Sequence, residues 1–169
     1  GDFAEAFNAA LKLASGDFTA LIEPDDTLPP HALFLIAEQI NTRQDADIVY
    51  GDEDQIDLSG ERTAPVFKTD WNPDLMLACN AIGRPCFYRT SLVRGIGGLR
   101  SRYGDSREYD LALRACTRSK PQRITHVPHV IYHRRNKTES GTLEAALAWH
   151  DPETACRAVA DHLQNENST

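Results

Sequence analysis

Hydrophobic positions along the first fifty residues switch between helical and strand spacing. Over residues 4–16, apolar side chains recur at helical spacing and a glycine follows, which predicts a helix that ends near Gly16. The run DFTALI is typical of a short buried strand, and two prolines then open a second predicted helix over residues 29–43. The segment ADIVYG predicts another strand, over 48–51, that opens into acidic residues. This order predicts an α/β domain with some parallel strand pairing.

The rest of the chain is less regular. The strand pattern RITHVPHVIYHRR contains Pro128, which predicts two short pieces and not one strand. From about residue 139 the pattern is helical, with a break near Pro152. We therefore expect a main domain over residues 1–138 and a trailing helical segment over 139–169. Shorter predicted elements are strands near 66–68 and 86–89, a helical or buried segment from Met76, and an amphipathic helix over 108–119.

Composition narrows the class of protein. The chain has 169 residues, of which 41% are hydrophobic, which is typical of one soluble globular domain with a real core. The formal net charge of −7 disfavours a nucleic-acid binder, which normally presents a basic face. The four cysteines form no C-x-x-C pair, so we expect reduced, mostly buried thiols and no zinc site of the usual spacing. No apolar run of the sequence approaches the length of a membrane span.

The stretch TALIEPDDTLPP places Glu23, Asp25 and Asp26 directly after the first predicted strand. Ligands of open α/β sheets bind beyond the carboxyl ends of the strands. Clustered carboxylates repel one another unless a cation or hydrogen-bond donors compensate, and such oxygen ligands suit Mg²⁺ or Mn²⁺ when phosphate oxygens complete the shell. On the turn alone, the simpler interpretation is solvated carboxylates, with Asp26 or Thr27 capping the next helix.

The acidic turn is one of several motifs in a fixed order. After FNAALKLASGDFTALIEPDDTLPPHAL come ADIVYGDEDQID, FKTDWNPDLMLACNAIGRPCFYR, GGLR, SREYDLALR and HVPHVIYHRR. Over residues 6–135 this order resembles the inverting family 2 glycosyltransferases with the GT-A fold, most of all those that build bacterial surface polysaccharides such as O-antigen. The resemblance implies transfer of a sugar from a nucleotide-diphosphate donor to an acceptor hydroxyl. It also implies a partial GT-A fold, with a mixed sheet flanked by helices and with C-terminal helices.

The resemblance also implies a metal site. EPDD matches the family's Asp-x-Asp-type motif, which binds Mg²⁺ or Mn²⁺ and thereby holds the donor diphosphate. Asp25 and Asp26 match the motif, whereas Glu23 stands where the family usually has aspartate, and its extra methylene moves the carboxylate. The segment IYHRR matches a family segment after the last strand and implies His133 as a third metal ligand or diphosphate contact. The residues of this segment that would neutralise the phosphates are Arg134 and Arg135.

The segment REYDL resembles the helix start that carries the family's general base. The resemblance implies that Glu108 takes the proton from the acceptor hydroxyl, with Asp110 in a supporting or acceptor-binding role. A structural interpretation fits the same residues, because DSRE reads as a capping box with Asp105 as N-cap and Glu108 at the third helical position. The two roles are compatible, since a helix N-terminus helps to keep a carboxylate ionised.

Two further segments carry candidate sugar-binding residues. YGDEDQID resembles the family's Y-S-D-E-D-K-I-D segment, which places Asp52, Glu53 and Asp54 at a second strand end facing the same cleft. There they would meet the donor sugar or acceptor hydroxyls, and Gln55 replaces the usual lysine. In FKTDWNPDL, Trp71 is either a stacking platform for a sugar or a packing residue.

The V-P-x-Y-N-like start and the early aspartate of the family, which bind the nucleotide base and ribose, have no counterpart in this sequence. We therefore expect the C-terminal part of a GT-A domain, with weak or no transferase activity in the isolated chain. An unpaired sheet edge would favour a homodimer formed through strands. The implied partners are a nucleotide-diphospho-sugar donor and a saccharide or lipid-linked saccharide acceptor. The implied location is the cytoplasm, or the inner face of the cell membrane.

Two other classes compete with the transferase. A non-catalytic carbohydrate- or partner-binding domain with a degenerate GT-A fold is favoured by Glu23, Gln55 and the missing N-terminal features, and it would not bind Mn²⁺ with a nucleoside diphosphate. A metal-dependent nucleotidyltransferase or hydrolase would also use an acidic turn at a strand end, but it does not explain REYDL and YHRR together.

Overall fold

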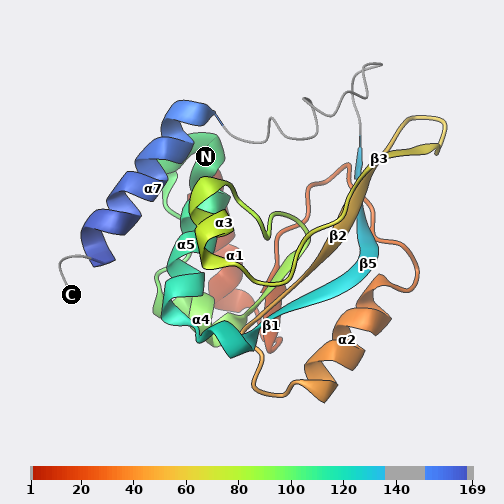
Figure 1. Cartoon of the computed structure of the whole chain (residues 1–169), viewed down its shortest axis with the longest axis horizontal. Coiled ribbons are helices and arrows are strands. Elements are labelled where there is room, and N and C mark those ends of the chain that lie inside the picture. Colours follow the sequence, from red (N-terminus) through yellow and green to blue (C-terminus); the bar gives the residue numbers. More distant parts are fainter. Residues whose placement is uncertain (1, 136–150, 167–169) are drawn as a thin grey trace.

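The fold is described from a computed structural model, over residues 2–135 and 151–166. Its elements in chain order are α1 Phe3–Leu13, β1 Phe18–Ala20, α2 Ala32–Thr42, β2 Ile48–Ile56, β3 Arg62–Val66, α3 Pro73–Ala78, β4 Cys86–Arg89, α4 Thr90–Gly95, η1 Ser101–Ser106, α5 Arg107–Arg118, η2 Pro121–Arg123, β5 Ile124–Arg135 and α7 Pro152–Glu166. Figure 1 shows the sheet between α2 on one face and the other helices on the opposite face.

The strands of the described chain form one mixed sheet centred on β2. On one side, β2 pairs in parallel with β5 along its whole length. On its other side, β2 pairs antiparallel with β4 through its first half and with β3 through its second half. β1 lies outside β4 and antiparallel to it, so β1, β2 and β5 run in the same direction. The predicted α/β class, with parallel pairing in a mixed sheet flanked by helices, is confirmed.

β2 extends further than the hydrophobic pattern predicted. The expected strand ended at residue 51, whereas β2 continues to Ile56 and keeps its acidic residues buried inside the sheet. Asp52 and Asp54 are tolerated there because each has a histidine within hydrogen-bond distance, His126 and His133 respectively. The expectation that these acids lie beyond a strand end is therefore wrong.

β5 is one continuous strand and not the two pieces predicted from Pro128. Its register against β2 shifts beside the proline, where the ladder skips from Val127 to Val130. A bulge of this kind leaves the proline, which has no N–H to donate, outside the ladder. The strand therefore continues past Pro128 and delivers its last residues to the acidic turn.

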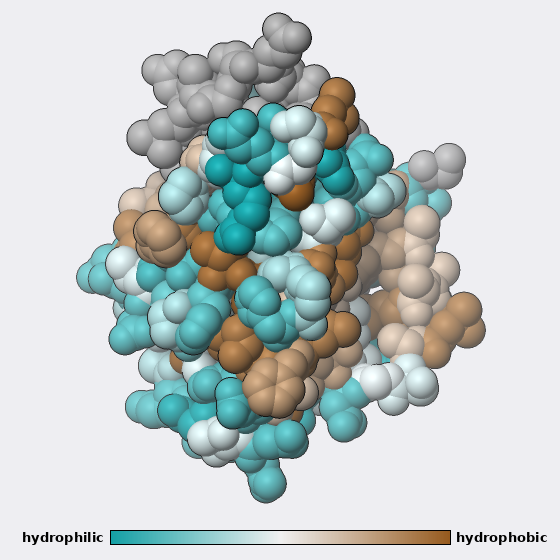
Figure 2. Space-filling model, turned by 90° about the vertical axis from the view of Figure 1, so that its right-hand side faces the viewer, coloured by the Kyte–Doolittle hydropathy of each residue, from teal (hydrophilic) through white to brown (hydrophobic). Residues whose placement is uncertain are grey.

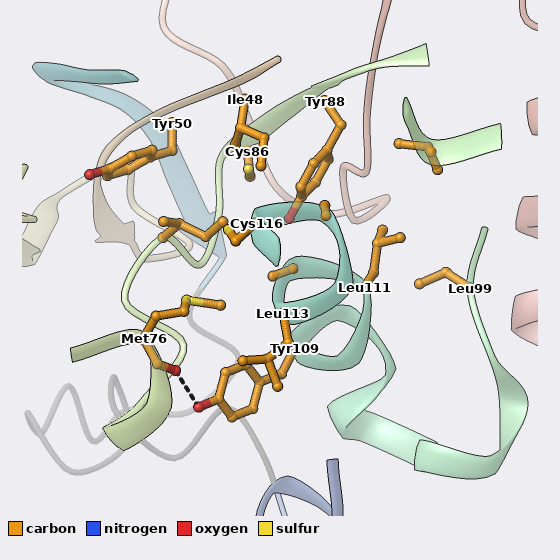
Figure 3. Packing of buried hydrophobic residues seen from close by; sticks show 14 of the residues in the cluster. Ile48, Tyr50, Met76, Cys86, Tyr88, Leu99, Tyr109, Leu111, Leu113 and Cys116 are labelled. Atoms are coloured by element: carbon orange, nitrogen blue, oxygen red, sulfur yellow. Dashed lines mark hydrogen bonds between the residues drawn. The ribbon is translucent and has the colours of Figure 1, made fainter. Parts of the chain in front are cut away.

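Two hydrophobic clusters hold the helices to the sheet. The larger cluster includes β2 and α5 residues together with α3, and within it the Tyr109 hydroxyl donates to the Met76 carbonyl at 2.6 Å (Figure 3). The smaller cluster packs α2 against the opposite face through Ile36, Val49 and Ile131. Both faces of the sheet are thus covered, which fixes the loops at its ends.

α5 begins differently from the prediction. The N-cap of α5 is Ser106, whose side chain makes no capping hydrogen bond. The Ser106 hydroxyl instead lies 2.9 Å from the Thr154 hydroxyl of α7. Asp105 is largely exposed and pairs with Arg107 at 3.7 Å. The predicted capping box is therefore wrong, and Glu108 is the second residue of the helix. Its carboxylate binds another partner, described below.

The trailing part of the described chain is helical. α7 starts at Pro152, where the sequence predicted a break, and packs on α5 and η1. The helical pattern predicted for residues 139–150 lies outside the described residues. No helix within residues 2–135 and 151–166 has the length and apolar character needed to cross a membrane.

The side of the molecule that carries α2 and β3 has hydrophobic groups among hydrophilic ones (Figure 2). Exposed large side chains there include Leu33 and Phe34 of α2, and Leu58 and Phe67 on either side of β3. Much of the surface of a folded protein consists of apolar atoms. This side by itself therefore indicates no partner.

Candidate active site

Arg84, in the loop before β4, joins the acidic turn to the start of α5. Its Nε donates to Glu108 Oε2 at 2.8 Å, and its Nη2 donates to Glu108 Oε1. The same Nη2 lies 2.8 Å from Glu23 Oε1, and Nη1 lies 4.0 Å from Asp26 Oδ2. One guanidinium thus holds together two segments that the sequence assigned to one site.

The Arg84 cluster is sheltered from water. The side chains of Arg84 and Glu108 are 16% and 19% exposed. Burial alone would lower the pKa of Arg84, but the hydrogen bonds and charge of Glu108 and the charge of Glu23 raise it above its usual value. Arg84 therefore stays positively charged, and its two-pronged contact fixes the orientation of the Glu108 carboxylate.

Asp26 is tied to the last strand. Tyr132 Oη donates to Asp26 Oδ2 at 2.6 Å, and the backbone N–H of Arg135 donates to Oδ1 at 2.8 Å. Thr27 and His133 exchange two backbone hydrogen bonds, of 3.0 and 2.9 Å. Burial and the Asp26 carboxylate raise the pKa of Tyr132, so its hydroxyl keeps its proton and remains a donor. The turn is thereby held in one place by β5.

Asp52 and Asp54 are paired within the sheet. His126 Nε2 lies 2.8 Å from Asp52 Oδ1, and His133 Nδ1 lies 2.5 Å from Asp54 Oδ1. Arg62 Nε donates to Asp54 Oδ2 at 2.6 Å. Both aspartates are therefore engaged by basic side chains of neighbouring strands, and they lie in networks distinct from the Arg84 cluster.

The predicted metal ligands are not assembled around a common point. Glu23 is paired with Arg84, and the ring of His133 with Asp54. In the described ranges, no three His, Cys, Asp or Glu side chains gather in an arrangement that would hold a metal ion. A site made of protein ligands alone does not fit these residues, so an ion at EPDD would need ligand oxygens to complete its shell. The predicted ligands were Glu23, Asp25, Asp26 and His133.

Asp110 lies in a network separate from that of Glu108. Arg114, one helical turn further along α5, donates to Asp110 Oδ2 at 2.9 and 2.7 Å, and Arg100 lies 3.6 Å from Oδ1. Arg114 also donates to the Ile96 carbonyl at 2.8 Å. Asp110 therefore holds the loop after α4 against α5, while Glu108 contacts the acidic turn.

The three remaining residues predicted to bind the donor or acceptor lie in two places, the hydrophobic core and the acidic turn. Trp71 is half-buried and packs against the larger core cluster, where it lines a pocket with Met76 and Leu113. Arg135 lies at the turn, and its Nη1 donates to the Asp57 carbonyl at 2.6 Å. Burial lowers the pKa of Arg134, against the charges of nearby carboxylates that raise it. The two arginines are therefore near EPDD, and Trp71 is in a packing position.

Glu53 is the unusual residue of β2. It is 2% exposed, and neither carboxylate oxygen has a hydrogen-bond partner within the described structure. Burial raises its pKa to about 7, although the positive charges of Lys68, Arg134 and Arg84 act in the opposite direction. The Lys68 amine is itself buried, which lowers its pKa, and its Nζ donates to the Ile82 and Arg84 carbonyls.

The raised pKa of Glu53 predicts a pH-dependent stability. The carboxyl loses its proton near its ordinary pKa of 4.5 when unfolded, but only near pH 7 when folded. The folded state therefore binds more protons between these values, and stability falls as pH rises through them. The difference in unfolding free energy between Glu53→Gln and wild type should therefore shift in favour of the variant by on the order of 3 kcal/mol as pH rises from 5 to 8.

Urea denaturation at several pH values measures this change, and Glu61→Gln is the matched control. Glu61 is an exposed glutamate on the turn after β2, so its replacement should give the same pH profile as wild type. A Glu53→Gln profile parallel to that of wild type would contradict the raised pKa.

Arg84 and Tyr132 carry no functional role predicted from the sequence. Arg84 stands alone in the largely apolar stretch AIGRPCFY, and a lone cation in such a stretch signals a buried acidic partner. Tyr132 sits in the strand pattern of β5, where nothing distinguishes it from a core residue. The two contribute the contacts that position Glu23, Asp26 and Glu108.

Comparison with solved structures defines the class of fold. The chain superposes on S. aureus TarS residues 1–349 with a TM-score of 0.61 and 17% sequence identity, covering 80% of this chain and 40% of that one. The likeness is one of fold, and it agrees with the predicted partial GT-A type, a mixed sheet flanked by helices. No family model matches the chain.

Two curated proteins are similar in sequence. The chain is 34% identical over 163 residues to the uncharacterized protein y4gI of Sinorhizobium fredii, covering 96% of this chain and 18% of that protein. It is 30% identical over 169 residues to the O-antigen biosynthesis protein RfbC of Myxococcus xanthus, covering 100% of this chain and 13% of that protein. The chain thus spans less than a fifth of the length of these relatives.

Proposed function

We propose that the protein acts in the synthesis of a cell-surface polysaccharide, as a glycosyltransferase that moves a sugar from a nucleotide-diphosphate donor to an acceptor hydroxyl. The observation that carries the proposal is the Arg84 cluster, which brings the EPDD turn to Glu108. These are the segments that the sequence assigned to donor binding and to proton removal. The similarity to an O-antigen biosynthesis protein supports the polysaccharide role.

Glu108 is suited to act as the general base. It lies in the first turn of α5, where the helix dipole favours a negative charge, and Arg84 fixes the direction of its carboxylate. In the proposed step Glu108 accepts the proton of the acceptor hydroxyl as that oxygen bonds to the anomeric carbon. The bond from this carbon to the donor diphosphate breaks on the opposite face, and its electron pair leaves with the diphosphate.

The EPDD turn is suited to the diphosphate end of the donor. Arg134 and Arg135 of β5 lie beside the turn, where guanidinium groups would neutralise phosphate oxygens. We infer that Asp25 and Asp26 would hold Mn²⁺ or Mg²⁺ together with the donor oxygens. Such an ion supplies positive charge to the departing diphosphate.

A non-catalytic carbohydrate-binding domain is the second candidate. It is favoured by the pairing of Glu23 with Arg84, because a protein cation already offsets the charge of the turn without a metal. In this case the domain would bind sugars but turn over no donor.

Release of nucleoside diphosphate distinguishes the two functions. The protein would be incubated with UDP-, GDP- and dTDP-sugars and a bacterial surface polysaccharide as acceptor, with Mn²⁺ or with a chelator. Acceptor-dependent release that requires Glu108 supports the transferase. Binding of polysaccharide without release of any nucleotide, both by this chain and by a longer native protein that contains it, supports the non-catalytic domain.

A further inference from the structure

A pocket separate from the Arg84 contacts opens between the β3 end of the sheet and three helices. Its volume is about 350 Å³. Glu53 and Lys68 contribute from the sheet side, and Tyr109 of α5, whose hydroxyl is bound to Met76 in Figure 3, contributes to the wall. Other lining residues include Thr69, Leu75, Ala78, Asn80, Ala81 and Gly83.

The Glu53 carboxylate, on the sheet side of this pocket, has no hydrogen-bond donor among the described residues. Both carboxylate oxygens of Glu53 are buried and without partners in the described structure. The Lys68 amine, the nearest positive group of the pocket, is already bound to two backbone carbonyls. A buried carboxylate without donors is costly, and such groups in proteins normally have a bound partner. The chemistry missing from the pocket is therefore a set of donors.

The charges around Glu53 favour neutral donors over a cation. Lys68, Arg84 and Arg134 all act on Glu53 and would oppose a bound ammonium group. The walls are mostly apolar, from Leu75, Ala81 and the ring of Tyr109. A ligand that offers hydroxyl groups to an acid and C–H groups to an apolar wall is a saccharide ring.

The pocket borders the candidate base. Asn80 and Gly83 line both this pocket and the small cavity that contains Arg84 and Glu108. Tyr109 follows Glu108 in α5. A ring in the pocket would therefore lie next to the residue that removes the acceptor proton. Arg84, which lines this small cavity, also contacts Glu23 of the EPDD turn, where the donor is proposed to bind.

We propose that this pocket binds the acceptor saccharide and that Glu53 accepts hydrogen bonds from its hydroxyl groups. The inference rests on the proposed transferase function, since it places the acceptor of that reaction. It makes Glu53 a residue that selects hydroxyl-bearing acceptors by direct contact. Asp52 and Asp54, its neighbours in β2, are already paired with histidines, whereas Glu53 is not.

Saccharide binding can be measured without any nucleotide. Backbone amide shifts in NMR spectra would be followed during titration with methyl glycosides of glucose, galactose, mannose, rhamnose and fucose. We expect saturable shifts of Lys68, Ala81 and Gly83 with at least one glycoside. At pH 8, where the Glu53 carboxylate is ionised, Glu53→Gln should weaken that binding about tenfold or more because a charged acceptor is lost, and the exposed Glu61→Gln should leave it unchanged. Cyclohexanol, with one hydroxyl on an apolar ring, is the comparison ligand.

A second variant tests the pocket without replacing the buried Glu53. Ala78 is exposed at the end of α3 and lines the pocket, so Ala78→Phe should fill it without disturbing the core, and should abolish glycoside binding. Failure of every glycoside to shift these amides would overturn the proposal, as would binding equal to that of cyclohexanol or unaffected by both variants. Nucleoside diphosphate binding, titrated separately, tests the transferase function, so a nucleotide that binds while glycosides do not refutes only this inference.

Discussion

Glu108→Gln should lower the rate of sugar transfer by about two to four orders of magnitude, the usual contribution of a positioned general base. The amide has the shape of the carboxylate and can still accept one hydrogen bond from Arg84, but it cannot accept the acceptor proton. Because Tyr132 and Arg135 bind Asp26 directly and not through Glu108, the turn should keep its hydrogen bonds to these two residues. Nucleotide affinity should therefore stay within about twofold of wild type.

The measurement is acceptor-dependent release of nucleoside diphosphate at saturating donor. Glu61→Gln serves as the control, since it makes the same chemical change on the surface. Wild-type turnover by Glu108→Gln would exclude Glu108 as the base. Asp110→Asn distinguishes the role of Asp110 from that of Glu108. Because Asp110 is paired with Arg114, this variant should lose stability and keep most of its transfer rate.

Arg84→Met should cost both stability and activity. The change leaves the carboxylates of Glu23, Asp26 and Glu108 near one another without the cation that joins them. Removing one partner of a fully buried ion pair costs about 3–5 kcal/mol, and partial exposure of this cluster reduces the expected loss to about 2–3 kcal/mol. The rate of transfer should fall by about a hundredfold, because Glu108 loses the fork that orients it.

Arg43→Met is the matched control for this prediction. Arg43 pairs with Asp45 at 4.0 Å and donates to the Gln122 carbonyl, both on the surface, and the side chains of the ion pair are 44% and 58% exposed. Such a pair contributes about 0–1 kcal/mol, so the control should change little. Arg84→Lys should recover part of the stability but little of the rate, because an ammonium lacks the planar fork. Equal stability of the Arg84 and Arg43 variants would contradict a central role for Arg84.

The spacing of apolar residues predicted which helices and strands form better than it predicted where they begin and end. The spacing of apolar residues located α1, α2, α5 and the strand at Cys86–Arg89, since these depend on one face being buried. The acidic half of β2 was missed because its burial depends on His126 and His133, which come from β5 far along the chain. The interruption expected at Pro128 did not occur, because a bulge absorbs the proline.

In the candidate site, too, features encoded in short segments were predicted and those that depend on distant contacts were not. EPDD and Glu108 were found as motifs, because their chemistry is visible in short segments of sequence. Arg84 was not found, since its importance comes from two contacts separated from it by 61 and 24 positions. The orphaned carboxylate of Glu53 was likewise invisible, because sequence does not reveal which buried acid lacks a donor. The metal ligands remain a prediction that only ligand binding will test.

Nucleotide binding at the EPDD turn is the most direct test of the account. The melting temperature would be measured with Mn²⁺ alone and with Mn²⁺ plus UDP, GDP or dTDP, for wild type and for an Asp25→Ala, Asp26→Ala double variant. A ligand that binds only the folded state at a hundred times its dissociation constant adds about 2.7 kcal/mol of stability. We predict a metal-dependent rise with one nucleotide in wild type and none in the double variant, each relative to its own ligand-free value. If no nucleotide stabilises this chain, the titration is repeated on a longer native protein that contains it. Absence of stabilisation in both, with or without Mn²⁺, would contradict a donor site at this turn.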